Sequence, residues 1–401
     1  MLDINRDRVV RNLKHLPIKN QPGTFMIFGH HKSGLSDYLN HFYSFDVMIN
    51  LQNPDTLRKL IADKDLYFLK NILQSENIQS VLIENTQLLQ TDFYKLTKHI
   101  NEKKIKIVLT SNDIEFYKHN LLNADYFYFP YLTLFELSLI EDFNKVLLRK
   151  AILNGFNPQV FTKDFSKAQL DQITGFYFSN LISIGSHRTQ IHQWSKLFEY
   201  ANNYNHQILN CERLAKSTLI PSRTVRSYVN KLTNLSYGFL LPGYKFSSNK
   251  GISSSKFYFY DPGIADSFSG SVIDEKDHYS LDLRFKNLMV LEIYKFILSL
   301  KKNVECFHFS WNRYEIDFLV LDHEKNQLLA FQFIFTEHLH EHHFKNNGFF
   351  QKLFLENFDI SKSLELKNHI VSMDQRRMNI QNILNIDLET FLNKLWKNEL
   401  F

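Results

Sequence analysis

The segment from Phe25 to Leu39 constrains the fold of this chain more than any other, because it joins an apolar run to a glycine-bounded loop. The run Phe25–Phe28 leads into residues 29–36, which read GHHKSGLS. The glycines and the final serine have the spacing of G-x-x-x-x-G-K-[ST], the loop that holds phosphate groups between a buried strand and a helix. Leu35 stands where that pattern has its lysine. The segment predicts the strand–loop–helix unit of a nucleotide site without its main cation; a simple tight turn is the alternative.

The composition sets the frame for the rest of the chain. At 401 residues the chain is long enough for two or three domains, and its 12 glycines and 8 prolines argue against long disordered linkers. A net charge of +5 permits contact with nucleic acid or with an acidic partner. Its two cysteines form no disulfide framework, and the sequence shows neither a signal peptide nor a membrane-spanning stretch. We expect a cytoplasmic protein with no membrane partner.

The first third of the chain alternates short apolar runs with helical patterns. Such alternation predicts a parallel sheet with helices on both faces, and ligands of such sheets collect at the carboxyl ends of the strands. The phosphate-loop candidate follows the first of these strands. The expected strands are 25–28, 47–51, 80–83, 105–110 and 126–129, and the expected helices include 56–61 and 93–100.

The middle of the chain is expected to be helical and then to form a helix-turn-helix with a β-wing. Residues 133–205 read as several helices. Two amphipathic helices follow, the second with an apolar stripe between Val225 and Leu232, and glycines then flank a hairpin. The other side of the second helix carries Arg223, Arg226 and Lys231. These residues predict contacts with the phosphates of duplex DNA, while a module that packs against protein is the alternative.

The last third begins with a long helix expected at 283–300. Strands are expected at 304–309, 315–321 and 327–335, and helix or irregular structure from about residue 360 onward. No internal repeat interrupts this order. The segment therefore predicts a third, smaller α/β part.

In this order the motifs resemble a bacterial and archaeal family of AAA-type P-loop ATPases joined to a winged helix and a restriction-endonuclease-like domain of unknown function. The resemblance covers nearly the whole chain and rests on motifs in series. They are GHHKSGLS at 29–36, INLQNP at 49–54, LIENTQ at 82–87, VLTSN at 108–112, FPYLTLFEL at 129–137, NGFNP at 154–158, KFYFYDPG at 256–263 and EIDF at 315–318.

The resemblance implies an α/β fold in four parts. These are a parallel-sheet P-loop (AAA-type) domain at 1–140, a helical lid at 141–205, a winged helix at 206–270 and a small α/β restriction-endonuclease-like domain at 271–401. It also implies ATP and Mg as ligands of the first part, with Ser36 and Glu84 as metal ligands. The residues that would hold ATP are Gly29, Lys32, Ser33, Gly34, Leu35, Ser36, Glu84 and Thr110.

The chain departs from the family pattern where catalysis needs charge. Leu35 replaces the lysine that neutralises the terminal phosphates, and a lost charged hydrogen bond is worth about 1.5–3 kcal/mol, or about ten- to a hundred-fold in affinity. Asn85 replaces the glutamate that polarises the attacking water, and Glu84 replaces an aspartate. The family's arginine before Pro130 is absent, and Asp125 lies near its place. We expect weak or absent ATP hydrolysis, as in a pseudoenzyme.

The nuclease-like part has lost its metal ligands in the same way. Asp317 matches one acidic magnesium ligand, but Gln332 and Ile334 stand where a glutamate and a lysine would lie. Lys286 takes the place of another glutamate. We therefore interpret Glu315 and Asp317 as solvated residues of an edge strand.

The histidine-rich segment Thr336–His343 is a further metal candidate. His338 and His342 have the i, i+4 spacing of ligands on one helix face, but Glu341 does not complete the H-E-x-x-H pattern. A histidine-rich loop that faces solvent is the favoured interpretation, and opportunistic binding of a divalent metal is the alternative.

Three functional hypotheses follow. The first is a protein that binds ATP with little or no turnover and serves as a binding or scaffold protein for another protein or for nucleic acid. The second is a DNA-binding regulator that acts through Arg223, Arg226 and Lys231. The third is an active ATPase in which Lys32 supplies the missing charge.

Overall fold

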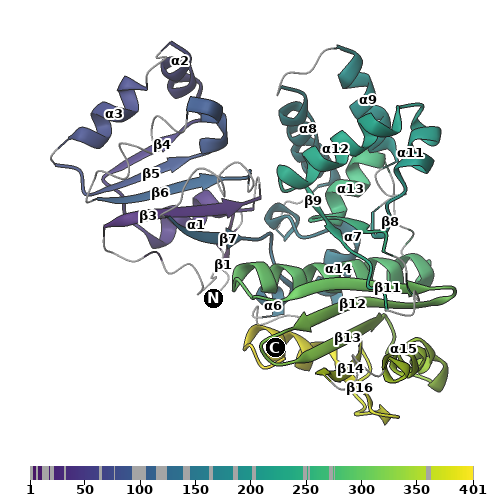
Figure 1. Ribbon diagram of the computed structural model, residues 1–401. Coiled ribbons are helices and arrows are strands. Elements are labelled where there is room, and N and C mark those ends of the chain that lie inside the picture. The colour runs from purple at the N-terminus through teal and green to yellow at the C-terminus, as the bar shows by residue number, and fades with distance from the viewer. Residues whose placement is uncertain are drawn as a thin grey trace. The chain divides into compact units, whose positions relative to one another are not determined.

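The computed structural model describes most of the chain as helices, strands and their connections (Figure 1). The described residues are 3–5, 8–10, 18, 22–30, 33–62, 66–75, 77–92, 105–113, 124–138, 145–161, 166–183, 188–200, 205–246, 251, 253–270, 274, 276–357 and 363–400. The expected helix at 93–100 and Lys32 lie outside them. The chain divides into a first unit of Met1–Leu132, Asn157–Asp164 and Asn230–Tyr237 and a second unit of Thr133–Phe156, Phe165–Val229 and Gly238–Phe401. The finer division into four parts stays a prediction.

The first unit contains a five-stranded parallel sheet, which confirms the prediction from the alternating apolar runs. The strand order is β4-β5-β6-β3-β7, so the first strand along the chain lies between the fourth and the fifth. All five strands end at the same edge, where ligands of parallel sheets bind. The strands are β3 (Gly23–Gly29), β4 (Val47–Asn50), β5 (Ser80–Glu84), β6 (Lys106–Ser111) and β7 (Asp125–Phe129).

Helices and a small hairpin complete the first unit. The hairpin pairs β1 (Asp3–Asn5) with β2 (Arg8–Val10). The helical elements are α1 (Leu35–Phe42), α2 (Pro54–Ala62), α3 (Tyr67–Gln74), η1 (Thr86–Asp92) and η2 (Pro158–Phe161). Tyr38 and Leu39 of α1 pack on a core that includes Ile27, Val108 and Phe129. Because each such side chain contributes about 1.5–3 kcal/mol when it leaves water, this packing holds α1 directly after β3.

The amino-terminal half of the second unit is mainly helical, as expected for residues 133–205. Its helices are α6 (Leu134–Ser138), α7 (Lys145–Asn154), α8 (Lys167–Ser183), α9 (Arg188–Glu199), α11 (Cys211–Thr218), α12 (Ser222–Asn234) and α13 (Pro262–Ser269). The residues of α12 from Asn230 onward belong to the first unit. Strand β8 (Gln207–Ile208) precedes α11, and β9 (Gly238–Leu241) pairs antiparallel with β10 (Lys256–Phe259) after α12. The apolar stripe between Val225 and Leu232 is buried, as its spacing predicted.

The carboxyl-terminal half of the second unit contains a separate mixed sheet of six strands in the order β11-β12-β13-β14-β16-β15. The strands are β11 (Glu305–Trp311), β12 (Tyr314–Asp322), β13 (Gln327–Ile334), β14 (Glu365–Ser372), β15 (Asn379–Ile380) and β16 (Ile383–Asp387). Helices α14 (His278–Ser299) and α17 (Leu388–Trp396) contact one face, and α15 (Lys345–Glu356) packs on the other (Figure 1). Strands β13, β14 and β16 are mutually parallel, and β11, β12 and β13 are antiparallel.

The expectation of helix or irregular structure after residue 360 was wrong for β14 and β16, whereas α17 is helical as expected. These strands contain polar residues, so hydropathy did not identify them as strands. Asn368 of β14 is buried and bonded to Asn347 of α15, and the Ser372 hydroxyl donates to Asn385 of β16 at 2.9 Å. Hydrogen bonding offsets the cost of burying these groups, so the strands are interior without being apolar runs.

Two motifs that lie far apart in the sequence meet in the second unit. A Cβ atom on Gly155, whose φ is +84°, would lie 1.9 Å from Oδ1 of Asp261. A Cβ atom on Gly263 would lie 2.0 Å from the carbonyl oxygen of Asn154. Asp261 is buried, caps α13 by accepting from the N–H of Gly263 at 2.8 Å, and has its pKa raised to about 6 by burial. The close backbone contact explains why both positions are glycine.

A fully buried carboxylate joins α14 to α6 and α17. Oε2 of Glu292 accepts from the N–H of Leu134 at 2.8 Å, and its Oε1 accepts from the N–H of Phe135 at 3.0 Å. The indole Nε1 of Trp396 donates to the same Oε1 at 2.8 Å. Lys295, one turn further along α14, is also fully buried and lies over the ring of Phe156. This carboxylate satisfies backbone donors at the start of α6 that would otherwise be buried without acceptors.

Candidate nucleotide site

The loop between β3 and α1 lies at the carboxyl edge of the first sheet. β3 ends at Gly29, and α1 begins at Leu35 after Gly34, whose φ of +84° favours glycine. Among the residues that the structure describes, the backbone N–H groups of Leu35, Ser36 and Asp37 have no hydrogen-bond acceptor. These donors mark the start of a helix, where partial positive charge accumulates, and they can bind an anion.

The structure brings Ser36 and Glu84 together, although they lie on different strand–loop segments. The Ser36 hydroxyl donates to Oε1 of Glu84 at 2.5 Å. Glu84 ends β5 and is buried; burial raises its pKa, the bond from Ser36 opposes this, and the nearby Asp37 adds to it. The sequence does not reveal the order of the strands, so it could not predict this contact. Two oxygen ligands of the kind that Mg²⁺ prefers thus meet beside the start of α1.

Leu35, at the position of the missing lysine, is a core residue. It is buried and belongs to the cluster that contains Phe25, Ile27 and Leu82. A Cβ atom on Gly29 would lie 2.7 Å from Cδ2 of Leu35, so these two residues fill the same space. In the usual loop this position carries the lysine that neutralises phosphate. In this chain the side chain at that position makes apolar contacts in the core.

Asn85 is held in place by its neighbours at the sheet edge. Its φ of +63° lies in the left-handed region, which asparagine tolerates better than most residues. Its N–H donates to Oγ1 of Thr110 at 3.1 Å, and its amide Nδ2 donates to Oδ1 of Asn50 at 3.0 Å. The Thr110 carbonyl in turn accepts from the hydroxyl of Thr86. Thr110 therefore supports the turn after β5, and Asn85 supplies no catalytic base.

His30 is a residue of this site that the sequence did not single out. It is buried, its Nδ1 lies 2.8 Å from the carbonyl oxygen of Ser236, and its Nε2 contacts the Tyr128 hydroxyl. Its ring stacks on Tyr131, with centroids 4.5 Å apart and planes at 4°. The sequence feature that could have singled out His30 is its position directly after Gly29. These contacts fix the side chain of His30 directly after β3.

The rest of the expected loop is described in part. Ser33 is buried, and its N–H donates to the carbonyl of His30 at 3.1 Å. Gly29 ends β3, Gly34 directly precedes α1, and Ser36 is the second residue of α1. Lys32 lies outside the described residues, so its role as a substitute cation stays a prediction.

The nuclease-like residues lie together, but their environment differs from the sequence interpretation. Asp317 and Glu315 are not on a solvated edge strand, because β12 lies between β11 and β13 and Asp317 is buried. Oδ2 of Asp317 accepts from the N–H of Phe333 at 2.8 Å, and burial raises the pKa of Asp317 to about 6. The nearby ammonium of Lys286 opposes that rise, and Lys256 pairs with Glu315. Lysine side chains neutralise the charge that a metal ion would otherwise balance.

Gln332 of β13 is also buried, and its Oε1 has no hydrogen-bond partner among the residues that the structure describes. It brings no charge to Asp317. Across the described part of the chain, no group of three or more His, Cys, Asp or Glu side chains could hold a metal ion.

The basic residues of the two helices before the β9–β10 hairpin differ in exposure. Arg223 and Arg226 of α12 are exposed, and Arg226 pairs with Glu212 of α11 at 3.5 Å on the surface. Lys231 is half-buried, and burial lowers its pKa. The two arginines can reach a ligand in solvent, whereas Lys231 presents less of its charge.

The histidine-rich segment does not form the single helix face that the alternative of metal binding requires. Residues before His340 are not helical, and the 3-10 turn η3 begins at Glu341, so His338 and His342 are not one helical turn apart. The N–H of His340 donates to Nδ1 of His343 at 3.0 Å. The segment forms a capped turn that leads into α15.

Residues 145–272 match a family model described as a domain of unknown function, DUF8612. A search of curated proteins gave no match. No helix among the described residues is long and apolar enough to cross a membrane.

Solved structures with some likeness include the replication initiator DnaA bound to AMPPCP and single-stranded DNA. It is 10% identical, with 52% of this chain and 82% of that chain covered and a TM-score of 0.27. Another is a signal transduction ATPase with numerous domains (STAND) and a tetratricopeptide repeat sensor from Pyrococcus horikoshii. It is 11% identical, with 75% of this chain and 49% of that chain covered and a TM-score of 0.28.

Proposed function

We propose that the first unit binds the phosphate groups of a nucleotide, ATP, at residues 29–36, and that the protein acts as a binding or scaffold protein with weak or absent hydrolysis. The observation that carries this proposal is the contact of Ser36 with Glu84 beside the unpaired N–H groups that open α1. Among the described residues, the Glu84 carboxylate accepts from the Ser36 hydroxyl and leaves these N–H groups open to an anion.

Magnesium fits the same residues. The Ser36 hydroxyl and the Glu84 carboxylate would hold it, and the bound ion would neutralise phosphate charge where the loop lacks a lysine. Burial raises the pKa of Glu84, which favours the neutral acid at a site without a cation. A divalent ion would favour the ionised form, so nucleotide affinity should depend on magnesium more than it does in a loop with lysine.

Three features support low turnover. Leu35 packs in the core and cannot neutralise a phosphate. Asn85 is an amide whose groups bond to Thr110 and Asn50, and it cannot take a proton from water. Asp125 brings negative charge where the family has an arginine, and it is exposed at the start of β7.

Restoring the lysine tests the proposal directly. We expect ATP to bind weakly to the wild-type chain, and Leu35→Lys to raise the affinity about ten- to a hundred-fold, because it adds one charged hydrogen bond to the phosphates. Leu35→Met is the matched control, because it keeps the length and the apolar character without the charge. Calorimetric titration with ATP and ADP, with and without magnesium, measures the effect, and circular dichroism checks that each variant is folded.

Equal affinity of the lysine and methionine variants would contradict the proposed phosphate position. Magnesium-dependent ATP hydrolysis that Ser36→Ala or Glu84→Gln abolishes would overturn the claim of low turnover. It would favour the active ATPase instead, and loss of that hydrolysis in Lys32→Ala would assign the substitute charge to Lys32.

A second candidate function is binding of duplex DNA by a winged helix formed by α11, α12 and the β9–β10 hairpin. The exposure of Arg223 and Arg226 on α12 favours it. If these side chains contact phosphates, the double variant Arg223→Gln, Arg226→Gln should bind less tightly and lower the slope of log affinity against log salt by about 0.9 per residue. Fluorescence anisotropy with a labelled duplex measures this, and Lys397→Gln is the control. Absence of binding by the wild-type chain at low salt would exclude this function.

A further inference from the structure

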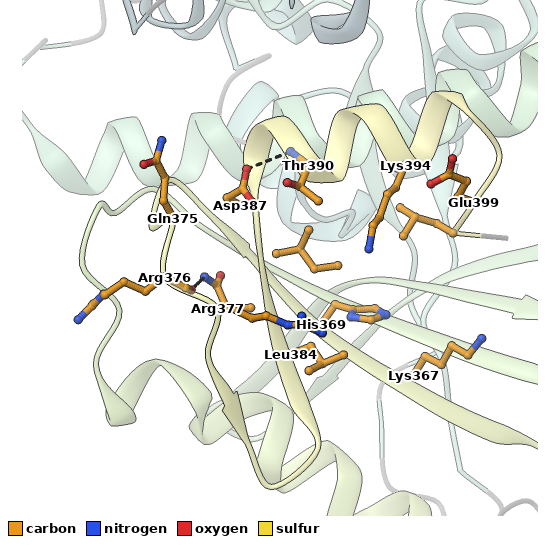
Figure 2. Close-up of a pocket in the computed structure, with 13 residues that line it drawn as sticks. Lys367, His369, Gln375, Arg376, Arg377, Leu384, Asp387, Thr390, Lys394 and Glu399 are labelled. Carbon is orange, nitrogen blue, oxygen red and sulfur yellow. Dashed lines mark hydrogen bonds between the residues drawn. The ribbon is translucent and has the colours of Figure 1, made fainter.

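The second unit has a cleft of about 420 Å³ between strands β14 and β16 of its mixed sheet and α17. Lys367 and His369 of β14 lie on its sheet side, and Thr390 and Lys394 of α17 lie on its helix side, one turn apart. Figure 2 shows the side chain of Lys394 reaching from α17 toward His369. The cleft is separate from the nucleotide site, which belongs to the first unit.

Two cations in this cleft have no counter-ion. Among the residues that the structure describes, neither Arg377 nor Lys394 has an ion-pair or hydrogen-bond partner for its side chain. Lys367 has the carboxylate of Glu365 at 4.0 Å, which is the limit of an ion pair. Arg376 differs from them, because its guanidinium is bonded to Asp374. The like charges of Arg377, Lys394 and Lys367 thus share one cleft with little compensation.

His369 supplies the second, independent observation. It is only 8% exposed, and neither of its ring nitrogens has a hydrogen-bond partner among the described residues. Its Nδ1 is fully covered, while its Nε2 is not among the covered atoms. The pKa of His369 is lowered to about 4, mainly by burial and to a smaller extent by the ammonium groups of Lys367 and Lys394. A neutral imidazole with its proton on Nε2 is a hydrogen-bond donor without a charge, and in the cleft it has no acceptor.

We propose that this cleft binds the phosphate of a small phosphorylated molecule, with Arg377, Lys394 and His369 as its donors. A planar guanidinium, an ammonium and an imidazole N–H are the donors that phosphate oxygens accept best. The volume lies within the range of small-molecule sites, and it admits a sugar phosphate or a nucleotide.

The carboxylates of the cleft fit such a ligand too. Oδ1 of Asp387 accepts from the N–H of Thr390 at 3.0 Å and so caps α17. Its Oδ2 has no partner among the described residues, and Glu399 lines the cleft at the carboxyl end of α17. Carboxylates accept from hydroxyl groups, which the uncharged part of a phosphorylated molecule carries. The cations and the carboxylates would divide the ligand into a phosphate end and a hydroxyl end.

Titration of the full chain with pyrophosphate at low salt tests the proposal. We expect the wild-type chain to contain a site whose affinity falls about tenfold in Arg377→Gln and about tenfold in Lys394→Gln, because each removes one charged hydrogen bond. Both side chains are exposed, so neither variant should change the thermal midpoint. Lys397→Gln, an exposed lysine of the same region outside the cleft, is the matched control and should bind as the wild type does.

The outcomes separate the cleft from the nucleotide site. If pyrophosphate binds the wild type and both cleft variants equally, any binding belongs elsewhere and the proposal is overturned. An equal loss in Lys397→Gln would also overturn it, because surface charge alone would then explain the binding. Loss of the pyrophosphate site in both cleft variants, with wild-type binding in Lys397→Gln, would support the proposal whether or not the first unit binds a nucleotide.

Discussion

Glu292→Ala is expected to lower the free energy of unfolding of the second unit by about 3–5 kcal/mol, because removing one partner of a buried charged network is costly. The substitution leaves the N–H groups of Leu134 and Phe135 and the indole N–H of Trp396 without an acceptor, and all of them meet at one fully buried carboxylate. It also removes a negative charge near the buried ammonium of Lys295. The expected loss in the free energy of unfolding therefore exceeds what any single hydrogen bond contributes.

Urea unfolding followed by tryptophan fluorescence measures this effect, because Trp396 reports on the affected contact itself. Glu292→Gln keeps the shape and one acceptor oxygen, so it should cost less than alanine. Glu389→Ala is the control: Glu389 is exposed in the first turn of α17, and its loss should cost less than about 1 kcal/mol. If Glu292→Ala unfolds at the same urea concentration as the wild type, the network does not hold α6 and α17 to α14.

Gly263→Ala is expected to destabilise the second unit by about 3 kcal/mol, the upper end of what overpacking costs. The added methyl group would lie 2.0 Å from the backbone carbonyl oxygen of Asn154 and 2.6 Å from its carbon. No rotation of a side chain relieves this contact, so α13 must move away from the end of α7. Asp261, which caps α13 and touches Gly155, would move with it.

Gly175→Ala is the control, because the same substitution is expected to raise the stability at that position. Gly175 lies inside α8, and a Cβ atom there meets nothing within 4 Å. Gly175→Ala should stabilise the protein by about 0.5–1 kcal/mol, because alanine loses less conformational freedom in a helix. Thermal unfolding of both variants measures the difference. Similar thermal midpoints for Gly263→Ala and Gly175→Ala would show that residues 154–155 and 261–263 do not pack together as they do in the structure.

The elements that the sequence predicted well are those with a local physical cause. The strand at Phe25–Phe28 and the helix after Gly34 follow from an apolar run and from the glycine that a left-handed turn requires. The stripe between Val225 and Leu232 follows from helical periodicity. In each case the deciding residues are neighbours in the chain.

The misinterpreted elements have causes that lie far away in the sequence. Asp317 is interior because β11 and β13 flank its strand, which nothing in EIDF reveals. β14 is a strand although its residues include Asn368 and Ser372, because side chains of α15 and β16 satisfy them.

For the candidate site, the sequence by itself determined which groups are present: a glycine-bounded loop, a hydroxyl at residue 36, a carboxylate at residue 84 and no lysine at residue 35. Residue types and short spacings are local, and they decide what chemistry is available. Only the tertiary structure decided that Ser36 touches Glu84, that Leu35 is part of the core, and that cations of β14, α17 and their connection share one cleft. Those facts depend on strand order and on which distant segments cover each charge, and both are set by packing across the whole unit.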